Sequence, residues 1–354
     1  MIVDARTIAR MTGLAPLIVE ERVAAFLDEH GLGEGPLTAT RIGEGGGSNF
    51  TFLLERGGER LVLRRPPRPP LPPSAHDMVR EAGLQKAIRA AGFGRLAEIV
   101  AVCEDESVLG VPFYVMRYLD GHVITRDLPA GLEEPAARRL LGLDLVDTLA
   151  EIHAAEVDRP ELAAFARPGS YLERQVRRFA QLWEINKTRE LSHVDAVGAW
   201  LAAHLPEPLP PTVVHGDYRL GNMMVALDEP TRIVAVLDWE MGAIGDPRAD
   251  VGYLLATYSE PQGPASPLGT SPITAEPGFP SRRDLVGRYV ERTGRDVEPL
   301  AWFEALALWK AAVFCEAIYG RYLRGELAAE DDRAARYELG VPFLADAAAV
   351  AAGV

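Results

Sequence analysis

The hydrophobic pattern of this chain changes in character at the Asp120-Gly121 pair, beyond which it is mostly helical. Before that pair, residues 41–65 run as three short apolar segments separated by Gly-rich turns, which predicts a three-stranded antiparallel meander. After it, apolar side chains recur mostly at the helical spacing of three and four residues. The pattern therefore predicts an α+β protein with a small β-rich amino-terminal lobe and a larger, mainly helical carboxy-terminal lobe.

Helical spacing also marks the elements around this meander. In the first lobe it predicts helices at 16–30 and 76–91, and the Pro-rich stretch 66–73 predicts a stiff linker rather than a ligand for an SH3-type domain. An apolar stretch at 110–119 predicts a strand. The helices predicted for the second lobe are 133–155, 170–187, 193–205, 283–293, 299–324 and 329–351. We therefore assign residues 1–118 to an N-lobe and residues 119–354 to a C-lobe.

Two stretches of the second lobe depart from the helical pattern. Residues 212–239 contain two short apolar segments around an Asp228-Glu229-Pro230 turn, which predicts a β-hairpin. Residues 259–281 hold six prolines. We expect a mobile loop there, since long loops without structure of their own are either functional lids or disordered.

The predicted hairpin brings two oxygen-bearing side chains together. Asn222 precedes the outgoing strand and Asp238 follows the returning one, and antiparallel strands of similar length end side by side. Asp217 lies five residues before Asn222, on the loop that enters the same mouth. Carboxylate and amide oxygens suit Mg²⁺, which takes a few protein oxygens and keeps positions for phosphate and water. Asn222 and Asp238 are therefore predicted as metal ligands.

The spacing from Asp217 to Asn222, with four residues between them, is also that of the kinase catalytic loop. In that chemistry an ionised Asp accepts the proton of the attacking hydroxyl, and Asn gives the metal a neutral oxygen without further anionic repulsion. Each residue alone is more often a turn former or a cap. Together with Asp238, in this order, they predict Asp217 as the catalytic base. A His-based metal site is a poor alternative, because His215 and Asp217 lack a third ligand.

The stretch from His215-Gly216-Asp217 to Asn222 resembles the catalytic loop of the aminoglycoside phosphotransferase and choline kinase superfamily. Residues 237–240 resemble its metal-binding segment, and residues 245–250 resemble a branch that includes kinase-like domains fused to acyl-CoA dehydrogenases. The resemblance implies a bilobal protein-kinase-like fold with the nucleotide between the lobes. It also implies an ATP- and Mg²⁺-dependent phosphotransferase whose acceptor is a hydroxyl of a small molecule.

The N-lobe carries a Gly-rich turn between two predicted strands. Backbone N–H groups of Gly45, Gly46, Gly47 and Ser48 can approach phosphate oxygens closely there, since glycine adds no side chain. The turn lacks the Gly-Lys-Ser/Thr of a Walker A loop, and a strand follows it where a Rossmann fingerprint requires a helix. We predict a loop that covers the ATP phosphates; a Gly-rich hairpin without a ligand is the alternative.

The resemblance assigns the phosphate-binding cation to Arg64, which takes the place of the family's strand Lys. Alternation along the strand puts Arg65 on the opposite face, so only Arg64 faces the nucleotide. Its forked guanidinium can bind phosphate bidentately but is not a compact point charge. Glu81 takes the place of the helix Glu that pairs with this cation; an ordinary solvated helix charge is the alternative.

The resemblance also implies an adenine site in the connector between the lobes. Backbone groups of Arg117 and Leu119 would contact the adenine edge, and Met116 would line the pocket. The end of an apolar strand is an equally good interpretation of these residues. Three polar residues elsewhere are interpreted as structural: His153 at a helix end, near the catalytic loop, and Asp246 and Asp250 as loop and N-cap residues.

The cofactors predicted are ATP, with GTP as the alternative donor, and Mg²⁺. A nucleotide-binding pseudokinase or regulatory module is the alternative function, favoured only by Arg64 in place of Lys. Protein kinase activity is not supported, because Asp-Phe-Gly and Ala-Pro-Glu segments with a loop between them are absent. The acceptor and the oligomeric state are left open.

Composition limits the partners. The chain has 51 Asp+Glu against 37 Lys+Arg, a formal net charge of −14, and no long basic run, which argues against nucleic acid and anionic membranes. Cys103 and Cys315 are too few for a disulfide framework, and residues 1–11 lack a signal-peptide core, so a cytoplasmic setting is expected. The apolar stretch 305–319 is too short to span a bilayer. The acid excess would suit a cationic acceptor, but net charge is not pocket charge.

Overall fold

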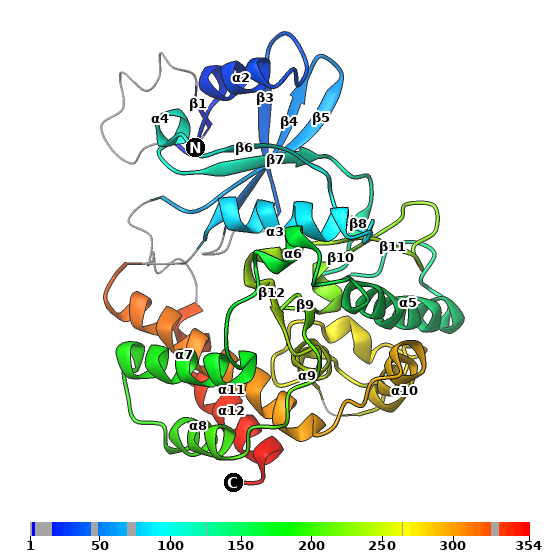
Figure 1. Ribbon diagram of the computed structural model, residues 1–354, viewed down its shortest axis with the longest axis vertical. Coiled ribbons are helices and arrows are strands. Elements are labelled where there is room, and N and C mark those ends of the chain that lie inside the picture. Colours follow the sequence, from blue (N-terminus) through cyan, green and yellow to red (C-terminus); the bar gives the residue numbers. More distant parts are fainter. Residues whose placement is uncertain are drawn as a thin grey trace. The chain divides into compact units, whose positions relative to one another are not determined.

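The computed structural model describes residues 2–3, 16–43, 49–68, 76–125, 127–263, 265–326 and 333–354. The chain divides into two compact units, residues 1–120 and 121–354, each with its own sheets and its own apolar core (Figure 1). The first unit is rich in strands and the second is mainly helical.

The first unit is built on one antiparallel sheet. Its elements are β1 (Ile2–Val3), β2 (Ile18–Val19), α2 (Glu20–Glu29), β3 (Thr38–Ile42), β4 (Phe50–Arg56), β5 (Glu59–Arg65), α3 (Met78–Ala90), β6 (Ile99–Cys103), α4 (Glu106–Leu109) and β7 (Phe113–Arg117). Within the described residues, five strands pair in the order β3-β4-β5-β7-β6. The predicted meander supplies the first three, whereas β6 was not predicted.

Alternation along β5 sorts its side chains to the two faces of this sheet. Leu61 and Leu63 are buried in the core that α2 covers. Arg65 follows on the same face, where its guanidinium donates to the carbonyls of Leu17 (2.6 Å) and Leu109 (3.3 Å). Arg64 therefore points to the other face, toward α3.

The second unit contains a small strand system among helices. Its elements are β8 (His122–Val123), α5 (Pro135–His153), α6 (Pro160–Ala163), α7 (Tyr171–Asn186), α8 (Ser192–Ala203), β9 (Thr212–Val214), η1 (Leu220–Asn222), β10 (Met223–Val225), β11 (Ile233–Val236), η2 (Trp239–Met241), β12 (Ala243–Gly245), α9 (Arg248–Thr257), η3 (Pro272–Ala275), α10 (Arg282–Thr293), α11 (Leu300–Leu323) and α12 (Arg333–Ala352). The strands pair as β11-β10-β8 and β12-β9. The predicted hairpin is β10 with β11.

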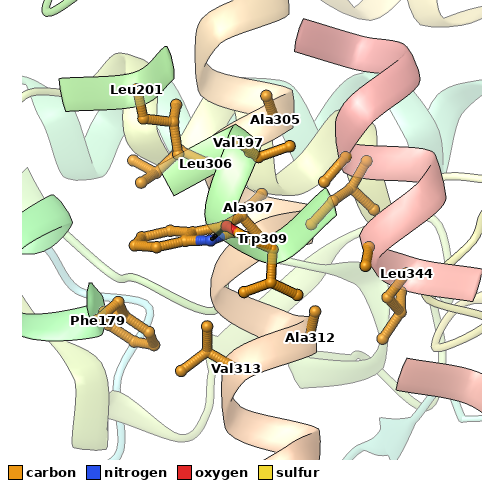
Figure 2. Packing of buried hydrophobic residues seen from close by; sticks show 14 of the residues in the cluster. Phe179, Val197, Leu201, Ala305, Leu306, Ala307, Trp309, Ala312, Val313 and Leu344 are labelled. Carbon is orange, nitrogen blue, oxygen red and sulfur yellow. Dashed lines mark hydrogen bonds between the residues drawn. The ribbon is translucent and has the colours of Figure 1, made fainter. Parts of the chain in front are cut away.

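The helical core of this unit is organised around α11. Figure 2 shows Trp309 of α11 lying among apolar side chains of α7, α8 and α12. The indole N–H of Trp309 donates to the Val194 carbonyl (2.9 Å), as a buried indole requires a partner. Beside it, α7 and α8 border a largely apolar groove of about 550 Å³, with Arg177 among its lining residues.

Two features of this unit differ from the sequence prediction. Helix α9 was missed because most of its side chains are buried, so its sequence has no polar face to mark a helical period. The expectation of a loose loop over residues 259–281 is wrong for the described part of it. There Ser266 donates to the Ala256 carbonyl (2.6 Å), and Thr274 donates to the Ser259 carbonyl (2.8 Å), with all four residues buried.

Within the described ranges, no helix is long and apolar enough to cross a membrane.

Candidate active site

The predicted catalytic loop is held by a buried carboxylate from α9. The side chain of Asp250 accepts hydrogen bonds from the backbone N–H groups of His215 and Gly216, both at 2.7 Å. The Nε2 of His153, at the end of α5, lies 3.2 Å from the same carboxylate. Asp250 is completely buried and lies inside α9, so its interpretation as an N-cap was wrong. Its role is to tie the loop to two helices.

The ring of His215 ties the same loop to the end of the hairpin. Its Nδ1 accepts the backbone N–H of Asp217 (3.2 Å), and its Nε2 lies 2.9 Å from the carbonyl of Leu237. This arrangement requires the tautomer with hydrogen on Nε2. Since both ring nitrogens are used, His215 is a structural residue and not a metal ligand.

Gly216 is needed for the path of this loop. Its φ is +82°, in the left-handed region that side chains rarely adopt. A Cβ added there would lie 2.9 Å from the Cβ and the carbonyl oxygen of Met241. Both features favour glycine between His215 and Asp217.

The hairpin brings together the three predicted residues of the metal and base site. Asn222 donates through Nδ2 to the Oδ2 of Asp217 and to its carbonyl, both at 2.8 Å. The backbone N–H of Leu237 donates to the carbonyl of Asn222 (2.8 Å), which places Asp238 directly after that link. Asp238 has φ +65°, a strained backbone for a residue other than glycine.

The donor set at this point fits Mg²⁺. Because the Asn222 amide nitrogen is directed at Asp217, its side-chain oxygen is left for a ligand, and the carboxylate of Asp238 adds a negative charge. The described residues contain no group of three or more His, Cys, Asp and Glu that could hold a metal. One amide and one carboxylate oxygen leave most coordination positions to phosphate and water, as Mg²⁺ prefers.

One carboxylate oxygen of Asp217 can accept a proton from a substrate. Its Oδ1 is buried and accepts no hydrogen bond from the described residues, and the Nε of Arg219 lies 3.4 Å from it. The hydroxyl of Tyr253 lies beside this carboxylate; burial raises the pKa of Tyr253 well above its usual range, and the charge of Asp217 raises it further. Sequence reasoning missed Arg219 and Tyr253. The only signal for Arg219 was its position inside the loop.

In the first unit, Arg64 and Glu81 form part of a buried polar cluster. The Nε of Arg64 lies 3.3 Å from the Oε1 of Glu81, whose side chain is almost fully buried. Tyr114 of β7 donates to the same oxygen (2.9 Å) and accepts from Gln85 (3.3 Å). Burial of the Tyr114 hydroxyl raises its pKa well above the usual range, and the charge of Glu81 raises it further. Glu81 is therefore not a solvated helix charge.

The predicted adenine-contacting residues lie at and after the end of β7. The backbone N–H of Arg117 is taken by the carbonyl of Glu98 (2.8 Å), so Arg117 can offer a purine only its carbonyl. The N–H of Leu119 donates to no residue in the described part of the chain. Met116 is partly buried. Binding of a nucleotide by these residues stays a prediction, as does the role of Gly45, Gly46, Gly47 and Ser48, which lie outside the described residues.

Comparison with known proteins assigns the family. A family model described as the phosphotransferase enzyme family matches residues 38–285, more than half of the chain. The chain belongs to the phosphotransferase enzyme family. The predicted membership of the aminoglycoside phosphotransferase superfamily is thereby confirmed.

Two solved structures resemble this phosphotransferase-family chain. A protein of Ralstonia eutropha assigned as an aminoglycoside phosphotransferase is 28% identical, with a TM-score of 0.73 over 93% of this chain and 97% of that one. A spectinomycin phosphotransferase in complex with ADP and spectinomycin is 10% identical, with a TM-score of 0.60 over 94% and 99%. The predicted fold, with a sheet-rich first part and a helical second part, is confirmed.

A curated relative of this phosphotransferase-family chain is a much longer protein. Acyl-CoA dehydrogenase family member 11 of Rattus norvegicus is 32% identical over 315 residues, which cover 87% of this chain. The matched region is 40% of that relative, so the chain spans well under half of its length. The predicted likeness to the dehydrogenase-fused branch is thereby confirmed.

Proposed function

We propose that this protein is an ATP-dependent phosphotransferase that transfers the γ-phosphoryl group to a hydroxyl of a small molecule. The observation that carries the proposal is the contact of Asn222 with Asp217 beside Asp238, at the mouth of the β10–β11 hairpin. The ADP bound by the spectinomycin phosphotransferase supports a nucleotide donor. GTP is the alternative donor.

In the proposed reaction, the acceptor oxygen bonds to the γ-phosphorus while the bond from that phosphorus to the β–γ bridging oxygen breaks. The acceptor proton passes to the Oδ1 of Asp217, and the nucleoside diphosphate leaves. Arg219, beside this oxygen, would balance negative charge in the transition state. A magnesium ion held by Asn222 and Asp238 would supply charge neutralisation for the phosphates.

The first unit would bind the nucleotide. Arg64, oriented by Glu81, would contact the phosphates, and Leu119 would donate its N–H to the purine. Arg64 in place of Lys is the one observation that favours the second candidate, a nucleotide-binding module without efficient transfer. The intact set of Asp217, Asn222 and Asp238 favours the enzyme.

The proposal is tested by Asp217→Asn, which keeps the shape of the residue and removes its basicity. We expect the variant to bind ATP normally and to lose about two to four orders of magnitude in kcat. The measurement is ADP release under ATP and Mg²⁺ with an acceptor that the unmodified protein uses. Full activity of the variant would exclude Asp217 as the base, and ATP binding without release for any acceptor would favour the pseudokinase.

A further inference from the structure

A buried tyrosine hydroxyl in the first unit contacts the carboxylate that pairs with Arg64. Tyr114 of β7 lies directly opposite Arg64 of β5 in the antiparallel register, so both side chains stand on the face of the sheet that α3 covers. The Oε1 of Glu81, from α3, lies 3.3 Å from the Nε of Arg64 and accepts the hydroxyl of Tyr114 at 2.9 Å. Two strands and one helix therefore meet at a single carboxylate oxygen.

Burial limits what the Tyr114 hydroxyl can do. Tyr114 and Glu81 are both almost fully buried, so water does not compete for their hydrogen bond. Because the pKa of Tyr114 is raised by burial and by the charge of Glu81, its hydroxyl remains a donor at neutral pH. The hydroxyl also accepts from the Nε2 of Gln85 (3.3 Å), which lies one helical turn after Glu81 in α3. Gln85 and Tyr114 thus form a chain of hydrogen bonds that ends on the Glu81 carboxylate.

The contact with Glu81 is made at the inner part of the Arg64 side chain. Nε is the guanidinium nitrogen nearest the backbone, and the two terminal nitrogens, which carry most of the N–H donors, extend farther along the side chain. The side chain of Arg64 is 13% exposed, whereas that of Glu81 is 2% exposed. Arg64 is therefore held from inside by a buried anion while part of it reaches the surface, an arrangement that suits bidentate binding of phosphate.

Binding of a phosphate would draw on the same guanidinium that pairs with Glu81. A carboxylate oriented only by that guanidinium would lose its position whenever the guanidinium shifts toward the ligand. Tyr114 supplies a further donor to the same carboxylate oxygen, and this donor comes from a different strand. The position of Glu81 therefore does not depend on Arg64 alone.

We propose that Tyr114 is a positioning residue for nucleotide phosphate: its hydroxyl, supported by Gln85, holds Glu81, and Glu81 holds Arg64 in the orientation that binds the phosphates. This inference rests on the proposed function, in which Arg64 contacts the nucleotide phosphates. Tyr114 itself would touch no substrate. Its loss should therefore weaken the binding only of ligands that carry phosphate, and only while Arg64 is present.

The experiment compares ADP with adenosine, which differ by the diphosphate alone. Their binding is measured by calorimetric titration in the presence of Mg²⁺, so that neither turnover nor an acceptor is needed. The variants are Tyr114→Phe, Gln85→Met, Arg64→Met and the double variant of Tyr114→Phe with Arg64→Met. Tyr258→Phe is the matched control, because it removes a buried tyrosine hydroxyl that donates to the Pro280 carbonyl (2.7 Å) in the second unit.

We expect the Kd for ADP to rise about 5- to 20-fold in Tyr114→Phe and less in Gln85→Met, while the Kd for adenosine stays unchanged in both. Arg64→Met should lose most of the affinity that the diphosphate adds, and Tyr114→Phe should cause no further loss in the double variant. Tyr258→Phe should bind both ligands like the unmodified protein. A merely structural role of Tyr114 would instead weaken both ligands alike and would add to the effect of Arg64→Met.

An unchanged Kd for ADP in Tyr114→Phe would overturn the inference, as would an equal rise for adenosine or a further loss in the double variant. ADP that binds to the unmodified protein no more tightly than adenosine would also overturn it. If Tyr114→Phe does not fold, Gln85→Met decides in its place, and unchanged ADP binding in that variant refutes the inference. Failure of the proposed function has a different signature. Absence of transfer to any acceptor, together with the expected loss of ADP binding in Tyr114→Phe, supports the inference and favours a nucleotide-binding module.

Discussion

At the scale of single residues, Lys310 is a lysine whose charged form is disfavoured by burial. Burial lowers the pKa of Lys310 and Arg178 of α7 lowers it further, whereas Asp250 of α9 and Asp217 of the catalytic loop act in the opposite direction. With a pKa of about 8 in the folded protein, below the ordinary 10.5, the folded state holds fewer protons than the unfolded state between these two pH values. The cost of the buried charge is therefore complete below about pH 8 and declines as the pH rises toward 10.5.

This linkage gives a prediction for Lys310→Met, which removes the charge. The variant should have a higher free energy of unfolding than the unmodified protein by about 1 to 3 kcal/mol at pH 7, and the difference should shrink by pH 10. Denaturant titrations at both pH values measure it. A stabilisation that is the same at both values, or a destabilised variant at pH 7, would contradict the assignment of a strained ammonium.

At the scale of elements, α9 positions the catalytic loop without supplying a reacting group. Asp250 is 35 residues from His215 and 97 residues from His153 along the chain, yet its carboxylate joins the loop to α9 and α5. A buried carboxylate that accepts several hydrogen bonds fixes its partners more firmly than an amide, which has one acceptor oxygen.

Asp250→Asn should therefore lower kcat at least 10-fold and the free energy of unfolding by about 2 to 4 kcal/mol. The control is Asp246→Asn, since Asp246 is equally buried but pairs with Arg248 and not with the loop. Activity assays at temperatures where both variants are folded measure the effect on kcat, and chemical denaturation measures the effect on the free energy of unfolding. If both variants lose stability alike and neither loses kcat, Asp250 has no positioning role.

At the scale of the whole molecule, the chain consists of two compact units with separate cores. Binding of MgATP should stabilise the folded protein according to ligand concentration, by about 2.7 kcal/mol at 100 times Kd. The part of this effect that depends on Mg²⁺ should disappear when EDTA removes the ion.

Asp238→Asn should also remove the Mg²⁺-dependent part of the stabilisation by MgATP. Asparagine tolerates the positive φ of this position, so the variant tests the charge and not the backbone. Thermal unfolding with ATP alone and with MgATP gives the comparison, and Asp228→Asn in the exposed hairpin turn is the control. A shift that survives in Asp238→Asn would remove this residue from the metal site.

The sequence by itself determined those features that depend only on residues close together in the chain. The meander, the long amphipathic helices and the convergence of Asn222 with Asp238 follow from side-chain period and from antiparallel register, which act over a few residues. The opposite directions of Arg64 and Arg65 follow from the same alternation. Asp217 and Asn222 are only five residues apart, so their convergence could likewise be predicted from the sequence, and their side chains are hydrogen-bonded in the structure.

Tertiary structure decided what depends on distant segments. Asp250 was interpreted as a cap, and α9 was missed, because burial on all sides leaves no polar face in the sequence. The prolines between residues 259 and 281 predicted a loose loop, but buried hydroxyl hydrogen bonds hold its described part. The burial of Lys310 depends on helices far apart in the chain, so its lowered pKa follows from packing and not from composition.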